Sequence, residues 1–191
     1  MSLLITTIKK LITISADEEA ILTNLFKPLN LKAGEYFLEE GQLCRYVGFI
    51  EEGLVRYYMN DDGNQKTLYF NKEGEFVSNY QSFLPRVPSN TSIQAIEDTV
   101  LQVINYADMQ RMYSDVKEGE RLGRLGIEHV FLNSIQQLKS FYKDSPADRY
   151  QEFLRCYPDL AQRIPQYYIA SYVGIKPQSL SRIRKRLVEP K

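Results

Sequence analysis

The spacing of apolar residues divides the chain into a strand-rich part between two helical parts. Near the start, Ser15 and Glu18 have the spacing of a capping box, and the apolar residues that follow recur at helical intervals, so we expect a helix from Ser15. From Leu29 to Ile104, short apolar runs alternate with turn residues, and six of the ten glycines lie within this stretch. Such a pattern is typical of short strands in a β-sandwich or barrel. The expected strands are 36–38, 46–50, 54–59, 67–70, 91–96 and 100–104, with a hairpin through residues 61–64.

The spacing becomes helical again after residue 104. Asn105 is placed to cap a short helix, and a longer helix is expected over about residues 118–142. This long helix is apolar on more than one side, and a helix of that kind must bury more than one side. We expect it to pack on its own chain and on the same helix of a second copy, in a homodimer; a helix buried on one side only is the alternative. The apolar residues assigned to this dimer helix are Leu122, Ile127, Phe131 and Leu138.

The last quarter of the chain predicts further helices and a tight turn. Ser145 and Pro146 suit the N-cap and the first position of a helix. The segment 169–187 then has the pattern of a helix-turn-helix, with small and apolar residues on one face of the first helix. Gly174 suits a turn that requires a positive φ, and Pro177 suits the start of the second helix. The expected buried stripe of the second helix is Leu180, Ile183 and Leu187.

The opposite face of this second helix is polar and basic. In a major groove, arginine can donate two hydrogen bonds to guanine, and glutamine can pair with adenine. Residues near the start of such a helix normally reach the bases, while other cations hold phosphates. We therefore expect double-stranded DNA as the partner. The residues assigned to base reading are Gln178, Ser179 and Arg182, and those assigned to phosphates are Lys176, Arg184, Lys185 and Arg186.

Charge is distributed unevenly, although the net charge is zero. From Lys139 onward the chain has 11 Lys and Arg against 5 Asp and Glu, so the remainder is acidic. A basic C-terminal part next to an acidic body favours a polyanionic partner. A solvated charged face would give the same counts, so the charge supports DNA binding only together with the helical pattern.

Several other functions are disfavoured by the composition. No apolar run approaches the ~18 residues of a membrane span, and the N-terminal stretch lacks a signal-peptide cleavage site, so we expect a cytoplasmic protein. Cys44 and Cys156 are far apart and have no metal-ligand spacing.

A metal-dependent enzyme of the double-stranded β-helix type is our second hypothesis. Such an enzyme needs a cluster of His and carboxylate ligands, but the single His129 lies outside the strand-rich part. We expect no catalytic residues, metal or resident cofactor. The third hypothesis is a ligand-binding or protein-interaction module whose helix-turn-helix does not bind DNA.

Residues 39–42 and 49–53 are similar to turns of a cyclic-nucleotide-binding β-roll, and residues 74–76 are similar to the start of its phosphate-binding cassette. With these segments, the long helix and the helix-turn-helix, the chain from about Leu25 to Leu187 resembles the Crp/Fnr superfamily of transcription regulators. The resemblance implies an α+β fold with a cyclic-nucleotide-binding-like β-roll and a helix-turn-helix whose β-wing is short or missing. It also implies a bacterial-type homodimer on a pseudo-palindromic DNA site, a small-molecule effector and RNA polymerase as a further partner. The implied domains are a sensor over residues 1–115, a dimerisation helix over 116–143 and a DNA-binding domain over 144–191.

The cassette departs from that of the relatives that bind cyclic AMP. Where those relatives hold the ribose with Gly-Glu and the cyclic phosphate with Arg-Ser, this chain has Ser78-Asn79 and Ser89-Asn90. A phosphate buried without a strong cationic partner is poorly compensated. We therefore expect that the effector is not cyclic AMP, and that the pocket holds another ligand or has lost ligand binding. The residues assigned to this effector pocket are Tyr36, Asn79, Tyr80, Gln81 and Asn90.

Overall fold

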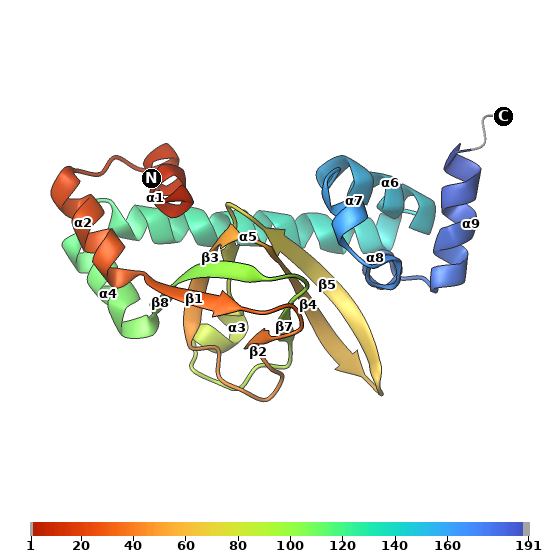
Figure 1. Cartoon of the computed structure of the whole chain (residues 1–191), viewed down its shortest axis with the longest axis horizontal. Coiled ribbons are helices and arrows are strands. Elements are labelled where there is room, and N and C mark those ends of the chain that lie inside the picture. Colours follow the sequence, from red (N-terminus) through yellow and green to blue (C-terminus); the bar gives the residue numbers. More distant parts are fainter. Residues whose placement is uncertain (1, 189–191) are drawn as a thin grey trace. The chain divides into compact units, whose positions relative to one another are not determined.

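The computed structural model describes residues 2–188 of the chain, which form two compact units (Figure 1). The first unit comprises residues 2–57 and 70–130, and the second comprises residues 58–69 and 131–188. The division falls within the long helix, and it assigns the outer part of a β-hairpin to the same unit as the C-terminal helices. The three functional segments that we expect from the resemblance have other boundaries and stay a prediction.

The strand-rich part forms two antiparallel sheets of four strands each. One sheet has the order β1-β8-β3-β6, and the other has the order β2-β7-β4-β5. The expected α+β fold with antiparallel sheets and C-terminal helices is confirmed, and all six expected strands are present with bounds shifted by a few residues. The strands are β1 (Lys27–Leu31), β2 (Tyr36–Leu38), β3 (Tyr46–Glu52), β4 (Leu54–Asp61), β5 (Asn64–Lys72), β6 (Phe76–Val77), β7 (Ser92–Ala95) and β8 (Thr99–Asn105).

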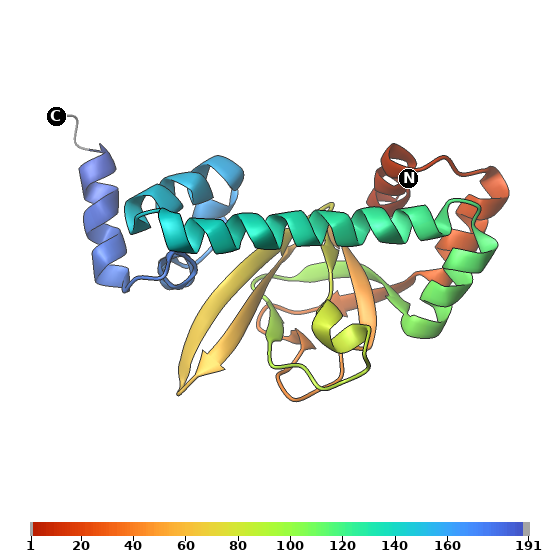
Figure 2. The same ribbon diagram turned by 180° about the vertical axis from the view of Figure 1, so that it is seen from behind.

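Helices precede, interrupt and follow these strands. The helices are α1 (Leu3–Leu11), α2 (Ala16–Leu25), α3 (Tyr80–Phe83), α4 (Tyr106–Asp115), α5 (Gly119–Lys143), α6 (Pro146–Cys156), α7 (Leu160–Arg163), α8 (Gln166–Val173) and α9 (Pro177–Val188). The long helix α5 is uninterrupted (Figure 2). No helix within residues 2–188 combines the length and the apolar character that crossing a bilayer requires. The sequence pattern did not predict α1, α3, α7, β1 or β6, most of which are too short to show a period.

The core of the first unit lies where the sheets bring their apolar side chains together. Phe49, Ile50 and Leu101 are fully buried, and the ring of Phe49 meets that of Phe76 edge to face with centroids 5.1 Å apart. The turn between β3 and β4 needs a glycine, because Gly53 has a φ of 103° and a Cβ there would lie 2.7 Å from backbone atoms of Asp98 and Thr99, at the start of β8. Close packing of this kind makes the core sensitive to changes in side-chain volume.

The expected hairpin is confirmed by its backbone geometry. β4 ends at Asp61 and β5 begins at Asn64, so Asp62 and Gly63 form the two-residue loop. Both loop residues have positive φ, 48° for Asp62 and 82° for Gly63. Two consecutive positive values are typical of a type I′ turn, whose twist matches that of the flanking strands.

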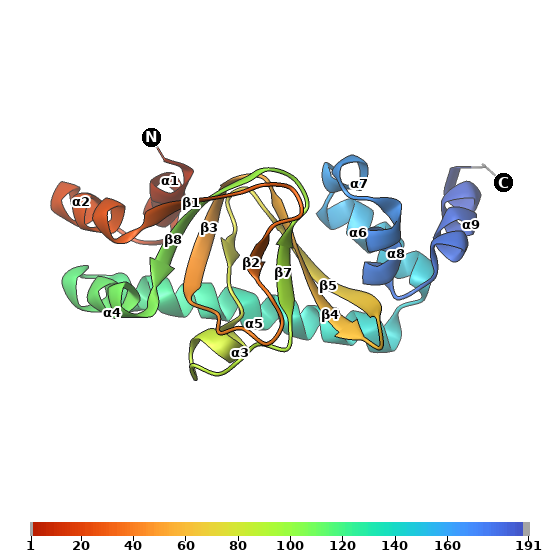
Figure 3. The ribbon, with the colours of Figure 1, turned by 60° about the horizontal axis from the view of Figure 1, so that its bottom comes forward.

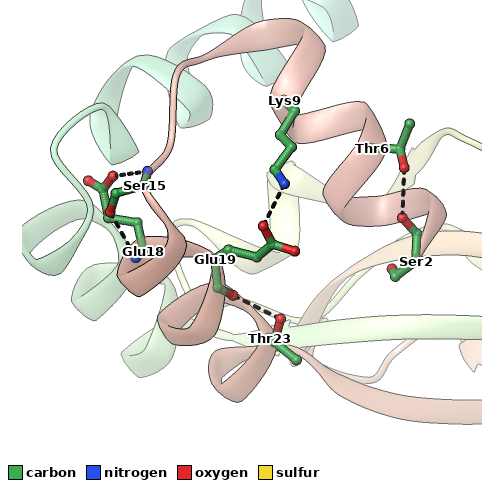
Figure 4. Close-up of polar contacts among 7 residues, drawn as sticks. All are labelled: Ser2, Thr6, Lys9, Ser15, Glu18, Glu19 and Thr23. Carbon is green, nitrogen blue, oxygen red and sulfur yellow. Dashed lines mark hydrogen bonds and ion pairs between the residues drawn. The ribbon is translucent and has the colours of Figure 1, made fainter.

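The N-terminal helices are anchored by local polar contacts (Figure 4). The Ser15 hydroxyl accepts a hydrogen bond from the Glu18 backbone N–H, and the Glu18 carboxylate accepts one from the Ser15 N–H at 2.7 Å. This is the expected capping box. Lys9 of α1 forms an ion pair with Glu19 of α2 at 2.5 Å. Glu51 of β3 accepts hydrogen bonds from the Leu3 and Leu4 N–H groups, so α1 is also fixed to the sheet at its N-terminal end.

We expect Ser15→Ala to lower the free energy of unfolding by about 1 kcal/mol, because the substitution leaves an N–H of the first turn without its cap. Urea denaturation followed by circular dichroism measures this loss. Thr23→Ala in the same helix is the matched control. The Thr23 hydroxyl donates to the Glu19 carbonyl at 2.8 Å, and alanine favours the helix interior, so this variant should be no less stable than the wild type. Equal losses in both variants would contradict the capping role of Ser15.

Candidate nucleic-acid interface

The helices α8 and α9 are joined by a tight left-handed turn (Figure 3). Gly174 ends α8 with φ 80° and ψ 32°, as its position in the sequence predicts. The Ile175 N–H returns to the Ala170 carbonyl at 2.9 Å, which satisfies a carbonyl at the end of α8. Pro177 then begins α9, where its missing N–H removes no helical hydrogen bond. Three residues, 174–176, therefore suffice to connect the two helices.

The contact between α8 and α9 is apolar and buried. Ile169, Ala170 and Val173 of α8 have no exposed surface, and Leu180 of α9 is 1% exposed. The expected stripe of α9 is only partly correct, because Ile183 is half-buried and Leu187 is 43% exposed. Both residues lie further from the turn than Leu180, toward the C-terminal end of α9.

The remaining surface of α9 is polar and cationic. The helix contains three arginines, one lysine and no acidic residue. At helical spacing, Gln178, Arg182 and Lys185 lie along one side, opposite the buried Leu180. A surface with this charge attracts polyanions. All seven residues that we assigned to DNA contact are exposed: Lys176, Gln178, Ser179, Arg182, Arg184, Lys185 and Arg186.

Arg184 differs from the other cations of α9. Its guanidinium donates a hydrogen bond to the Gln166 side-chain oxygen at 2.8 Å, at the start of α8. At 100° per residue it lies on the flank of α9 next to Leu180, away from Arg182. This contact holds the Arg184 side chain at the edge of the cationic surface.

Two side chains that the sequence did not single out support this pair of helices. The first is Arg149 of α6. Its Nε donates to the Val173 carbonyl at 2.8 Å, its Nη1 donates to the Asp144 carbonyl at 2.7 Å, and its guanidinium lies 5.3 Å from the centre of the Phe141 ring. It thereby satisfies the last carbonyl of α8 before the turn. In the sequence Arg149 has no distinguishing signal, because it has the spacing of an ordinary charged helix residue.

The second supporting side chain is Ser171 of α8. Its hydroxyl accepts a hydrogen bond from the Thr67 N–H and donates one to the Gln65 carbonyl, both at 2.9 Å. Gln65 and Thr67 belong to the outer part of β5, which lies in the same compact unit as α8. Strand β5 is at the edge of its sheet, so its backbone groups need partners other than a strand. The Ser171 hydroxyl provides partners for two backbone groups of β5 and thereby links the hairpin to α8.

We expect Ser171→Ala to lower the free energy of unfolding by about 1–3 kcal/mol, since it removes both hydrogen bonds while Thr67 remains 3% exposed. Thermal and urea denaturation measure the loss. Ser181→Ala on α9 is the control, because Ser181 is exposed and belongs to the same unit. If Ser171→Ala were as stable as Ser181→Ala, the Ser171 hydroxyl would have no supporting role.

The structure separates the four apolar residues of α5 into two sets. Leu122 is 5% exposed and belongs to the core of the first unit, so we remove it from the dimer surface. Leu122 lies in the first turns of α5, within the first unit, where its side chain is buried by other residues of the same chain. Ile127, Phe131 and Leu138 are 39%, 60% and 53% exposed and lie on one side of the helix. Other large exposed apolar residues of α5 are Val130, Leu132, Phe141 and Tyr142.

The residues assigned to an effector pocket lie at different places in the first unit, and their assignment stays a prediction. Asn79 is buried as the N-cap of α3, Tyr80 follows it, and Gln81 and Asn90 are exposed. Burial raises the pKa of the Tyr80 hydroxyl, which therefore stays protonated. Tyr36 lies on β2 and is 37% exposed.

A hollow of about 400 Å³ in the first unit is lined by other residues: Phe37, Leu38, Gln42, Leu43, Arg45 and Tyr46. Within residues 2–188, no group of three or more His, Cys, Asp and Glu residues is placed to hold a metal ion.

Comparisons with known proteins agree with this description. Residues 28–115 match the family model of the cyclic nucleotide-binding domain. No sequence among curated proteins matches the chain. Similar solved structures include FixK2 from Bradyrhizobium japonicum (TM-score 0.73, 15% identity, covering 85% of this chain and 84% of that one). Others are the c-di-GMP-responsive global regulator CLP of Xanthomonas campestris (TM-score 0.72, 15% identity, 91% of each chain) and a Crp/Fnr-family transcriptional regulator of Eubacterium rectale (TM-score 0.70, 14% identity, 91% of this chain and 83% of that one). The chain therefore has the fold of Crp/Fnr-type regulators.

Proposed function

We propose that the chain is a DNA-binding transcription regulator that acts as a homodimer and inserts α9 into the major groove. The observation that carries this proposal is the two-sided character of α9: Leu180 is buried against α8, while Gln178, Arg182 and Lys185 face outward with no acidic residue beside them. A helix fixed on one side and cationic on the other has what groove binding requires. Gln178, Ser179 and Arg182 read bases, and Lys176, Arg184, Lys185 and Arg186 hold phosphates.

The dimer is proposed from the exposed apolar side of α5. Phe131 and Leu138 are 60% and 53% exposed and lie on the same side of the helix. An apolar surface of this kind marks an interaction site, and a helix that meets its own copy forms a two-fold symmetric contact. Two copies of α9 related by that symmetry read a pseudo-palindromic site with half-sites about one turn of DNA apart. By the same resemblance, RNA polymerase is the partner through which such a regulator acts.

Selection of bound sequences from a random DNA pool tests this function. We expect enrichment of a pseudo-palindrome, and we expect the logarithm of the association constant to fall with the logarithm of salt concentration by about 0.9 for each phosphate contacted. Fluorescence anisotropy with the selected DNA measures that slope. If the pool yields no enriched sequence and binding is absent at low salt, the chain does not bind DNA. A ligand-binding or protein-interaction module is then the better description.

A further inference from the structure

The match to a cyclic nucleotide-binding domain implies a cyclic nucleotide as a ligand, and the residues of the cassette decide whether one fits. By the resemblance, Ser78 and Asn79 stand at the ribose side of such a site, and Ser89 and Asn90 stand at the phosphate side. A cyclic phosphate is an anion that needs hydrogen-bond donors and a cation. A cyclic nucleotide therefore fits only if these four positions have unused hydrogen-bond donors and a cation close by.

The amide oxygen and the amide nitrogen of Asn79 both form hydrogen bonds within the protein. Its Oδ1 accepts hydrogen bonds from the Gln81 and Ser82 N–H groups at 3.0 and 3.3 Å, where it caps α3. Its Nδ2 donates to the Ser89 hydroxyl at 2.7 Å. Asn79 is 9% exposed. The two sides of the expected site are thus joined directly to each other by one side chain.

Ser89 has no hydrogen-bonding capacity left for a ligand. A hydroxyl offers one donor and two acceptor positions. The Ser89 hydroxyl donates to the Thr91 carbonyl at 2.7 Å, and it accepts from the Thr91 N–H at 3.0 Å and from Asn79. All three positions are used, and the residue is 5% exposed. A phosphate oxygen would have to displace one of these buried bonds.

The backbone donor at Ser78 is also occupied. Its N–H donates to the Tyr57 hydroxyl at 3.0 Å. Tyr57 is 8% exposed, and burial raises the pKa of its hydroxyl, so the group stays neutral at every physiological pH. The neighbouring loop is closed by Ser82, whose hydroxyl accepts from the Cys44 N–H at 2.9 Å and donates to the Val87 carbonyl at 2.5 Å.

The single cationic side chain of the cassette segment itself lies at the surface. Between residues 76 and 92 the chain has one cationic side chain, Arg86. Arg86 is exposed, has a φ of 60°, and holds its guanidinium 5.5 Å from the centre of the Tyr106 ring. A cation stacked on an aromatic ring at the surface does not compensate a phosphate buried between Asn79 and Ser89.

We propose that this cassette is closed on itself: Asn79, Ser89 and Tyr57 occupy the hydrogen-bonding groups that a cyclic nucleotide would need, and the domain does not bind cyclic nucleotides. The internal network takes the place of the ligand and holds α3 against the loop that leads to β7. In consequence, the DNA affinity of the proposed regulator is independent of cyclic nucleotides.

Isothermal titration calorimetry of the full chain with cyclic AMP and cyclic GMP at millimolar concentration tests the first part. We expect no saturable heat. A saturable titration with either nucleotide would overturn the proposal. Because calorimetry is performed without DNA, its result stands whether or not the chain binds DNA, so the failure of this inference and the failure of the proposed function are distinguishable.

A pair of asparagine variants tests whether the network holds the cassette. Asn79→Ala removes the cap of α3 and the bond to Ser89, and it should lower Tm by about 2–8 °C. Asn90→Ala is the matched control, because Asn90 is exposed and its side chain accepts a hydrogen bond from the adjacent Thr91 hydroxyl at 3.2 Å, outside the network of Asn79. We expect its Tm to equal that of the wild type. A decrease in Tm for Asn79→Ala no larger than that for Asn90→Ala would overturn the network.

Discussion

Phe131→Asp should convert the proposed dimer to a monomer and remove high-affinity binding to the selected DNA. Phe131 is 60% exposed on α5, and burying a phenylalanine side chain contributes about 1.5–3 kcal/mol. Only the exposed 60% of the side chain remains to be buried, and in a two-fold symmetric contact the residue occurs twice, so the dimer should lose about 2–4 kcal/mol. This corresponds to a weakening of the dimer by about thirtyfold to a thousandfold. The charge of the aspartate adds a desolvation cost in the same direction.

Sedimentation velocity measures the loss of the dimer, and fluorescence anisotropy with the selected DNA measures the loss of affinity. Leu84→Asp is the control, because Leu84 is 47% exposed in the first unit and does not belong to α5. We expect this variant to remain dimeric and to bind DNA as the wild type does. A Phe131→Asp protein that is still dimeric would show that this side of α5 is not the dimer interface.

Arg182→Ala should weaken binding to the selected DNA by about 1–3 kcal/mol in each half-site and relax the preference for one base pair. The reason is the position of Arg182, on the exposed side of α9 and one helical turn from Gln178 near the start of the helix. Residues in that part of a recognition helix normally reach base edges. Binding to unrelated DNA should change much less, since phosphate contacts dominate it.

Arg186→Ala provides the comparison. Arg186 is exposed in the last turns of α9, and we assign it to a phosphate. We expect this variant to bind all sequences more weakly by the same factor, and to reduce the salt slope by about 1 for each phosphate that is no longer neutralised. Anisotropy titrations on the selected site and on a scrambled site, each at several salt concentrations, separate the two behaviours. An equal loss of affinity on both DNAs for Arg182→Ala would reassign Arg182 to the phosphates.

Local rules predicted much of the fold. The capping box at Ser15, the type I′ loop at Asp62 and Gly63 and the left-handed turn at Gly174 are all found where the sequence placed them. Each depends on the conformational preferences of a few consecutive residues, so neighbours along the chain contain all the required information. The cationic surface of α9 was predictable for the same reason: the helical period and the buried Leu180 are sufficient to orient it.

Such local rules do not predict contacts between residues that are far apart in the sequence. The sequence placed Leu122 with Phe131, but whether a helix face is covered depends on segments far away in the chain, and of these two residues only Phe131 is left exposed. Ser171 and Arg149 have ordinary helical spacing, and their roles follow from the backbone groups of β5 and α8 that they meet.

The sequence by itself determined the elements, the turns and the chemistry of the C-terminal helix, because these follow from residue type and spacing. Only the tertiary structure decided which apolar faces are covered and which polar groups are already satisfied. The cassette shows the difference. The sequence reveals that no arginine stands at the expected phosphate position, whereas the hydrogen bond from Asn79 to Ser89 shows that the polar groups present there already have partners within the protein. Burial and hydrogen-bond saturation are properties of residues brought together from distant positions, so they exist only once the chain has folded.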